Sequence, residues 1–160
     1  MNSLNLNTKI LVYSYEESKE SIKKLIEEAK LAAKNAYAPY SGFHVGAAIL
    51  LRNGTIIRGS NQENAAYPSG LCAERVAMYS ANATYPDIAV KMIAIAASNK
   101  GVFTHQPCCP CGSCRQSILE VENRFDSAIK IIMYGTDHIY EVESIKTLLP
   151  LSFDKTSLDL

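Results

Sequence analysis

The sequence has no excess of either charge, no basic run and no long apolar stretch, and each absence narrows the functions open to it. Lys plus Arg and Asp plus Glu each number 16 among 160 residues, so the formal net charge is zero. A polynucleotide partner requires clustered basic side chains that neutralise phosphates, and the chain contains no such cluster. We therefore expect no nucleic-acid partner.

Residues 1–20, MNSLNLNTKILVYSYEESKE, contain no apolar segment long enough for a secretion signal or a membrane span. The five cysteines are an odd number, and four of them lie in residues 107–115, PCCPCGSCR. A chain of this length closes a core without disulfides, and clustered free cysteines suit a reducing compartment. We expect a cytoplasmic protein with no membrane partner.

No repeat or low-complexity linker divides the chain, and its length is that of one domain. Apolar residues recur with helical spacing over residues 18–36, which predicts a helix that ends before Pro39. Two extended runs, FHVGAAILL and TIIRGSN, flank Asn53-Gly54, a dipeptide that favours a tight turn. These two strands should therefore pair antiparallel in a hairpin. We expect a single domain over residues 18–160, preceded by an N-terminal extension of residues 1–17.

The second half of the chain alternates between helical and buried extended patterns. SGLCAERVAMYSANA predicts a helix that begins near Ser69 or Gly70, followed by strand KMIAIAAS, helix GSCRQSILEVEN and strand AIKIIMYG. A helix between two buried strands implies a parallel crossover, whereas the short link before HIYEVES allows only a hairpin.

The segment IKTLLPLSF predicts a short helix broken at Pro150. The expected fold is a three-layer α/β/α sandwich around a five-stranded mixed sheet whose last strand is antiparallel, with KILVYS offering an extra strand.

The cysteine cluster contains two overlapping metal-ligand pairs, since Cys108 and Cys111, and Cys111 and Cys114, each have Cys-x-x-Cys spacing. Cys72 and Cys114 fall in the first turns of two predicted helices, and Cys111 just precedes the second. Helix N-termini favour thiolates, and these two can meet at one edge of the sheet. Three thiolates there would hold Zn²⁺ with the fourth position open for water.

Glu74 follows Cys72 by two residues and can project across such a metal towards its water. A carboxylate that does not ligate the metal can take the proton of that water and deliver it to a substrate nitrogen. Three thiolates leave the site negatively charged, and Arg75 can offset that charge by donating to the sulfurs.

The motifs CAE at residues 72–74 and PCGSC at residues 110–114 resemble the signature of the zinc-dependent deaminases. Four blocks, YAPYSGFHVGAA, NQENAAYPSGLCAER, PCGSCRQ and LLPLSF, are similar in order and spacing to the small homotetrameric cytidine deaminases. The resemblance runs from about residue 37 to residue 153. It implies a cytidine deaminase-like catalytic domain in which Cys72, Cys111 and Cys114 bind one Zn²⁺ per chain and Glu74 is the catalytic proton shuttle.

The activity that the resemblance implies is hydrolytic deamination of cytidine, and of 2′-deoxycytidine, by a zinc-activated water. The products are uridine or deoxyuridine and ammonia, as in pyrimidine salvage, and no organic cofactor is needed. The resemblance also implies that Phe43 packs on the pyrimidine, that Asn61 and Glu63 hold the 3′-hydroxyl, and that the Ala73 N–H donates to the pyrimidine O2.

The resemblance further implies a homotetramer whose sites are shared between subunits. Groups from neighbouring subunits would be Ala65, Tyr67 near the 5′-hydroxyl, and the tail residue Phe153 closing over the base. An apolar side chain on a tail beyond Pro150 is reasonable if another chain covers it.

Three alternatives remain open at this point. His105, Cys108 and Cys109 have spacing suited to a second or competing metal site, although Cys108 and Cys109 also fit small residues lining a loop. A related deaminase of polynucleotides or nucleoside antibiotics would share the zinc motif; zero net charge and the short link before HIYEVES favour a free nucleoside. A non-catalytic module would close the zinc site with a fourth thiolate from Cys108 or Cys109.

Overall fold

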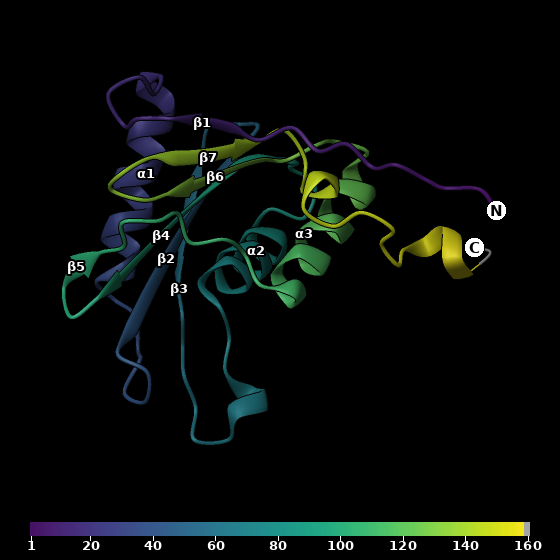
Figure 1. The fold of residues 1–160 in the computed structure, drawn as a ribbon. Coiled ribbons are helices and arrows are strands. Elements are labelled where there is room, and N and C mark those ends of the chain that lie inside the picture. Colours follow the sequence, from purple (N-terminus) through teal and green to yellow (C-terminus); the bar gives the residue numbers. More distant parts are fainter. Residues whose placement is uncertain (159–160) are drawn as a thin grey trace.

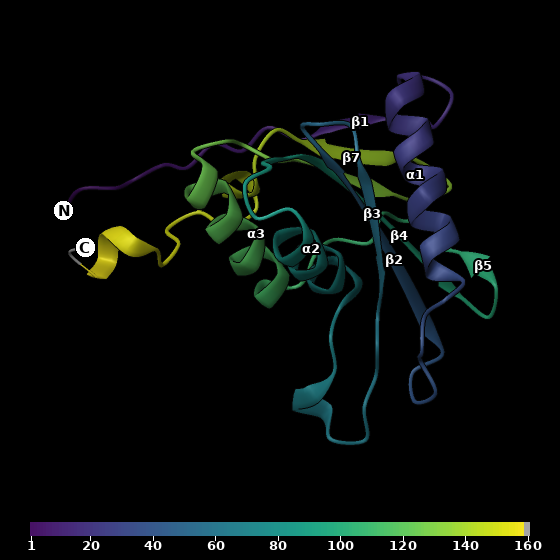
Figure 2. The same ribbon diagram turned by 180° about the vertical axis from the view of Figure 1, so that it is seen from behind.

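The computed structural model describes residues 1–158, and its centre is a seven-stranded mixed sheet of order β1-β7-β6-β4-β2-β3, with β5 paired to β4. The strands are β1 Leu11–Tyr13, β2 Phe43–Leu51, β3 Ile56–Ser60, β4 Val90–Asn99, β5 Val102–Phe103, β6 Lys130–Tyr134 and β7 Ile139–Val142. The helices are α1 Glu20–Ala33, α2 Ala73–Thr84 and α3 Gly112–Phe125. Helix α1 covers one face of the sheet, and α2 and α3 cover the other (Figure 1, and from behind Figure 2).

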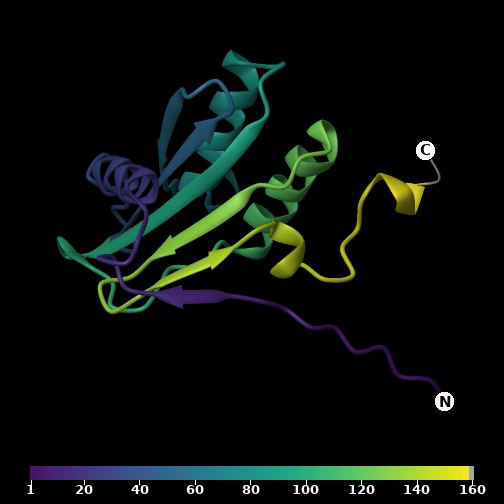
Figure 3. The same ribbon diagram turned by 90° about the horizontal axis from the view of Figure 1, so that it is seen from above.

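The expected α/β/α sandwich is confirmed, and its five expected strands are β2, β3, β4, β6 and β7. Strands β2 and β3 form the antiparallel hairpin, β4 and β6 are parallel, and β7 is antiparallel to β6. Two short strands, β1 and β5, extend the expected sheet. The segment KILVYS supplies β1, which pairs with β7 at one edge, and residues before it run outward from the body (Figure 3).

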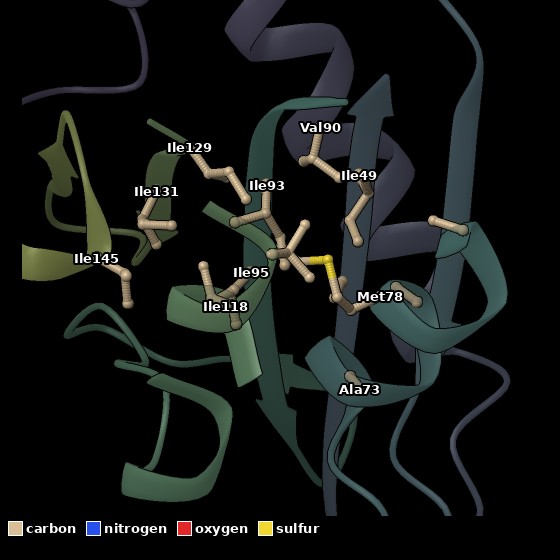
Figure 4. Packing of buried hydrophobic residues seen from close by; sticks show 14 of the residues in the cluster. Ile49, Ala73, Met78, Val90, Ile93, Ile95, Ile118, Ile129, Ile131 and Ile145 are labelled. Carbon is tan, nitrogen blue, oxygen red and sulfur yellow. The ribbon is translucent and has the colours of Figure 1, made fainter. Parts of the chain in front are cut away.

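Alternate residues of the central strands point to opposite faces, so the same strands contribute to two cores. On the α2 and α3 side, Ile49, Ile93 and Ile95 pack with Met78 of α2 and Ile118 of α3 (Figure 4). On the α1 side, the predicted apolar face of the helix is buried against small strand residues such as Ala48 and Ala94. The central strands are therefore buried on both faces.

Helix α2 rests directly on β3 because β3 carries a glycine at the contact. A Cβ on Gly59 would lie 2.5 Å from the carbonyl oxygen of Ala73 and 2.4 Å from the backbone nitrogen of Ala77. Any larger residue would push the helix away from the sheet. This contact positions the first turn of α2 relative to the sheet, and that turn contains Glu74.

The prediction that α2 begins near Ser69 or Gly70 is wrong. Residues Tyr67–Ser69 form a separate 3₁₀ turn, and the backbones of Gln62 and Leu71 exchange two hydrogen bonds of 2.9 and 3.0 Å. This pairing keeps the chain extended up to Cys72. Cys72 is therefore the N-cap residue of α2 and does not lie within its first turn.

The predicted C-terminal helix is reduced to the 3₁₀ turn Ile145–Thr147, followed by a tail with a second 3₁₀ turn at Lys155–Leu158. The buried carboxylate of Glu122 in α3 accepts hydrogen bonds from the backbone of Ile145 and the hydroxyl of Ser144, which holds the first turn in place. Pro150 then limits any longer helix. Among residues 1–158 there is no helix with the length and apolar composition needed to span a membrane.

Candidate functional site

The thiols of Cys72, Cys111 and Cys114 converge where the N-termini of α2 and α3 approach each other. Cys72 and Cys111 are the N-cap residues of the two helices, and Cys114 lies in the first turn of α3. The Sγ atom of Cys111 lies 3.7 Å from that of Cys72 and 3.5 Å from that of Cys114. Neither N-cap sulfur caps its own helix with a hydrogen bond. The sulfurs thus remain available to a ligand.

The three-sulfur cluster fits zinc. All three Sγ atoms lie within 4.8 Å of one another, and tetrahedral zinc with bonds of about 2.3 Å separates its sulfur ligands by about 3.8 Å. The partial positive charges of two helix N-termini stabilise thiolates at this position. Cys114 is buried whereas Cys111 is exposed. The cluster therefore has one open side, as a catalytic zinc site requires.

The surroundings of Cys72 lower the pKa of its thiol. The pKa of Cys72 falls to about 5, first because of a hydrogen bond with the Cys114 thiol and then because of Arg75. The Arg75 guanidinium lies 3.9 Å from the Cys72 sulfur. The same hydrogen bond, together with burial, raises the pKa of Cys114. These shifts favour the thiolate form of Cys72 and the protonated form of Cys114, whose proton a metal would displace.

Glu74 lies beside this cluster with its side chain largely withdrawn from solvent, since only 5% of the residue is exposed. Burial raises the pKa of the Glu74 carboxyl, and the negative charge on Cys72 adds to that effect. A carboxyl group whose pKa is raised in this way takes up a proton more readily than one in water. The residue is chemically suited to accept and return a proton within the site.

One cavity of about 700 Å³ joins the cluster to the other predicted site residues. Glu74 and Arg75 line it, together with Cys72 and Cys111 of the cluster. Most of the predicted residues line this cavity, namely Phe43, Asn61, Glu63, Tyr67, Cys72, Glu74, Arg75 and Cys111. Ala73 is fully buried at the start of α2, between Cys72 and Glu74.

Ala65 and Phe153 do not line the cavity within one chain. Ala65 is exposed, and Phe153 is 60% exposed on the C-terminal tail. The carbonyl oxygen of Phe153 accepts a hydrogen bond of 2.8 Å from Gln116 of α3, which holds the tail against that helix. Tyr67 is also highly exposed, at 78%, although it lines the cavity.

The part of the cavity wall formed by Asn61 and Glu63 is tied by side-chain hydrogen bonds to the start of β2 and the turn before it. The amide of Asn61 accepts from the backbone N–H of Val45 at 2.7 Å and donates to the carbonyl oxygen of Phe43 at 2.9 Å. The carboxylate of Glu63 accepts from the hydroxyl of Ser41 at 2.5 Å, and this contact lowers the pKa of Glu63. Sequence reasoning missed Ser41, because its partner lies 22 residues away and leaves no local pattern.

The loop that leads into Cys111 is held by the turn between β6 and β7. Backbone N–H groups of Thr136 and Asp137 donate to the carbonyl oxygens of Thr104 and His105 at 3.0 and 3.2 Å. A Cβ on Gly135 would lie 2.4 Å from the His105 carbonyl oxygen. The turn and the loop are therefore packed backbone against backbone, a contact that sequence reasoning also missed.

The other proposed metal ligands lie outside the cluster. His105 is exposed, and its Nδ1 lies 3.1 Å from a carboxylate oxygen of Asp137. Within residues 1–158, the three-sulfur cluster is the only group of three close metal-binding side chains. Cys108 and Cys109 line the cavity instead, and burial raises the pKa of Cys108 to about 11. Cys108 is thus a neutral thiol in the cavity wall.

We expect the Gly135→Ala variant to bind zinc about 10- to 100-fold more weakly, because the added Cβ displaces the loop that carries Cys111. Competition with a chromogenic chelator measures this affinity. The matched control is Gly46→Ala, whose Cβ would lie 2.0 Å from the Ala29 carbonyl oxygen on the α1 face. The control should melt at a lower temperature and keep its zinc affinity. Unchanged zinc affinity in Gly135→Ala would show that the turn does not position the loop.

The amino-acid sequence of this chain is similar to that of a family of known proteins. Residues 19–128 match the model of the "Cytidine and deoxycytidylate deaminase zinc-binding region". A cytidine deaminase from Sporosarcina psychrophila is 39% identical over 137 residues, which cover 86% of this chain and 94% of the relative. A cytidine deaminase from Halalkalibacterium halodurans is 45% identical over 97 residues, 61% of this chain and 69% of the relative.

The crystal structure of cytidine deaminase from Burkholderia pseudomallei has the same fold. It superposes with a TM-score of 0.70 at 37% identity, over 82% of this chain and 98% of that one. The region that matches the family model contains both cysteine motifs and all the residues that line the cavity.

Proposed function

The chain belongs to the cytidine and deoxycytidylate deaminase family, and from this premise we propose that it hydrolyses cytidine and 2′-deoxycytidine to uridine and deoxyuridine with release of ammonia. The observation that carries the proposal is the buried carboxyl of Glu74 beside a three-sulfur cluster in a cavity of about 700 Å³. Cavities of this size accommodate small organic ligands. With these substrates, the proposed role of the reaction is in pyrimidine salvage.

The enzyme is zinc-dependent, since the family region is a zinc-binding one and the cluster fits the ion. We assign one zinc per chain to Cys72, Cys111 and Cys114. When bound, zinc acts as a Lewis acid that makes a water molecule nucleophilic near neutral pH. Arg75 offsets part of the negative charge of the three thiolates, because its guanidinium lies against the Cys72 sulfur.

In the proposed reaction, Glu74 moves the protons. Its carboxylate takes a proton from the attacking water and passes it to N3 of the pyrimidine, which makes C4 more electrophilic. The water oxygen adds to C4, and Glu74 then takes the remaining proton of this hydroxyl and delivers it to the 4-amino group. The C4–N bond breaks, ammonia leaves, and the C4 carbonyl of uridine forms. The backbone N–H of Ala73, at the N-terminus of α2, donates to the pyrimidine O2.

We propose that the cavity wall formed by Phe43, Asn61 and Glu63 binds the nucleoside. We assign Phe43 to the face of the pyrimidine, and Asn61 and Glu63 to the 3′-hydroxyl of the sugar. The hydrogen bonds that fix Asn61 to the start of β2 and Glu63 to Ser41 support this assignment, because they hold polar groups in place at the cavity wall.

We further propose a homotetramer in which Ala65, Tyr67 and Phe153 complete the sites of neighbouring subunits. The exposure of Tyr67 at 78% and of Phe153 at 60% supports this proposal, since aromatic side chains gain by being covered. Residues 18–160 would form the catalytic domain, with residues 1–17 as an extension. Five free cysteines suit a cytoplasmic location.

A comparison of cytidine with its 5′-monophosphate tests this function. Arg75 is the only basic residue lining the described cavity, and it already contacts Cys72. A 5′-phosphate, which would lie near Tyr67, therefore has no free basic partner in the cavity, so we expect kcat/KM for cytidine to exceed that for the monophosphate by at least about 100-fold. A preference for the monophosphate would show that the substrate is a nucleotide and not a nucleoside. Turnover of neither would contradict the proposed function.

A further inference from the structure

A single hydroxyl group joins two residues of the proposed nucleoside site. The Oγ atom of Ser41 donates to Oε1 of Glu63 at 2.5 Å and accepts from the backbone N–H of Phe43 at 3.0 Å. Glu63 is the proposed sugar ligand, and Phe43 carries the ring proposed to pack on the pyrimidine. Ser41 therefore lies between the group that recognises the sugar and the group that recognises the base.

The carboxylate of Glu63 is held from more than one direction. Its Oε2 atom accepts from the backbone N–H groups of Tyr40 at 2.8 Å and of Ser41 at 3.3 Å. These donors fix the position of Oε2 but leave the carboxylate free to turn about it. The Ser41 hydroxyl engages the other oxygen, so it also fixes the orientation of the carboxylate plane.

The hydrogen bond between Ser41 and Glu63 is not needed to anchor the start of β2. Asn61 already ties the backbones of Phe43 and Val45 to this wall. The backbone of Glu63 itself donates to the carbonyl oxygen of Tyr37 at 2.8 Å. Ser41 is exposed, so its hydroxyl contributes no buried packing. The Ser41 hydroxyl is therefore the group that sets the direction of the Glu63 carboxylate.

We propose that Ser41 is a positioning residue for sugar recognition: its hydroxyl orients the Glu63 carboxylate to accept a hydrogen bond from the 3′-hydroxyl of the nucleoside. The inference rests on the nucleoside function proposed above and deepens it. A carboxylate that is already oriented loses less side-chain freedom when the sugar binds, and affinity rises accordingly. Because the sugar does not react, the contact acts equally on the ground state and the transition state.

The Ser41→Ala variant therefore has a defined kinetic signature. We expect KM for cytidine to rise about 10-fold, the cost of losing one hydrogen bond to a charged group, while kcat stays within about twofold. With 2′,3′-dideoxycytidine, which lacks the 3′-hydroxyl, KM should be the same in the parent and the variant. The conservative variant Ser41→Thr should restore most of the loss, since it retains the hydroxyl.

A double-mutant cycle with Glu63→Gln separates positioning from a general loosening of the turn. If Ser41 acts through Glu63, the double variant should raise KM no further than Glu63→Gln alone. Additive effects, or an equal loss with 2′,3′-dideoxycytidine, would overturn the proposal and leave Ser41 as a structural turn residue. The melting temperature and zinc content of each variant show whether the fold is intact.

Calorimetric binding of uridine, the product, tests the proposal without turnover. We expect Ser41→Ala to weaken uridine binding about 10-fold and to leave binding of 2′,3′-dideoxyuridine unchanged. A parent protein that binds uridine with this dependence but does not deaminate cytidine would contradict the proposed reaction and support the role of Ser41. A parent that does not distinguish uridine from its dideoxy analogue would overturn the role of Ser41 whether or not it is active.

Discussion

Substitution of Glu74 by glutamine is expected to lower kcat for cytidine by about 10²- to 10⁴-fold while the protein keeps its zinc. Glutamine has the size and shape of glutamate, so it fills the same buried position at the start of α2. It cannot take the proton of water at neutral pH, and it cannot pass one to N3 or to the leaving amino group. The loss should therefore fall on the chemical step.

The decrease of cytidine absorbance in single-turnover experiments measures this loss, and elemental analysis gives zinc per chain. The matched control is Glu63→Gln, the same substitution at the other carboxylate that lines the cavity. The control should raise KM and retain most of kcat. A zinc-loaded Glu74→Gln protein that keeps kcat within about threefold of the parent would show that another group moves the protons.

Replacement of Cys114 by serine is expected to remove both zinc and activity. Cys114 is fully buried in the first turn of α3, so no other side chain can easily take its place. A serine hydroxyl is a poor ligand for zinc at neutral pH because it remains protonated. We expect zinc affinity to fall by more than about 100-fold, the upper range for the loss of a supporting contact.

Zinc content after dialysis against a weak chelator measures the effect of Cys114→Ser, and turnover follows on the same samples. Cys109→Ser is the control, because Cys109 lines the cavity but lies outside the three-sulfur cluster. It should retain zinc and turnover. Loss of zinc from Cys109→Ser together with its retention in Cys114→Ser would show that Cys109, and not Cys114, is a zinc ligand.

Local patterns in the sequence predict much of the fold because they arise from local physical constraints. The apolar face of α1 follows from helical spacing, and its members Leu25 and Ile26 are fully buried. The direction of β7 follows from the length of the link that precedes it, since a few residues allow only a hairpin. The two cysteine motifs are equally local, and they are brought together at the ends of two helices.

Three features that depend on distant residues were not predicted. The start of α2 is set by the pairing of Gln62 with Leu71. The local sequence contains no pattern that predicts this pairing. The contact of Ser41 with Glu63 joins residues 22 positions apart. The packing of Gly135 on the loop at His105 is visible only once β6 and that loop lie side by side. Each is a tertiary contact that the sequence pattern does not record.

The most direct test of the account is to measure zinc per chain and cytidine turnover on one preparation of the purified protein. The account predicts one zinc per chain, with loss of cytidine absorbance matched by an equal amount of ammonia. Removal of the metal should abolish the reaction, and added zinc should restore it. A protein that contains its full zinc and turns over neither cytidine nor 2′-deoxycytidine would contradict the account.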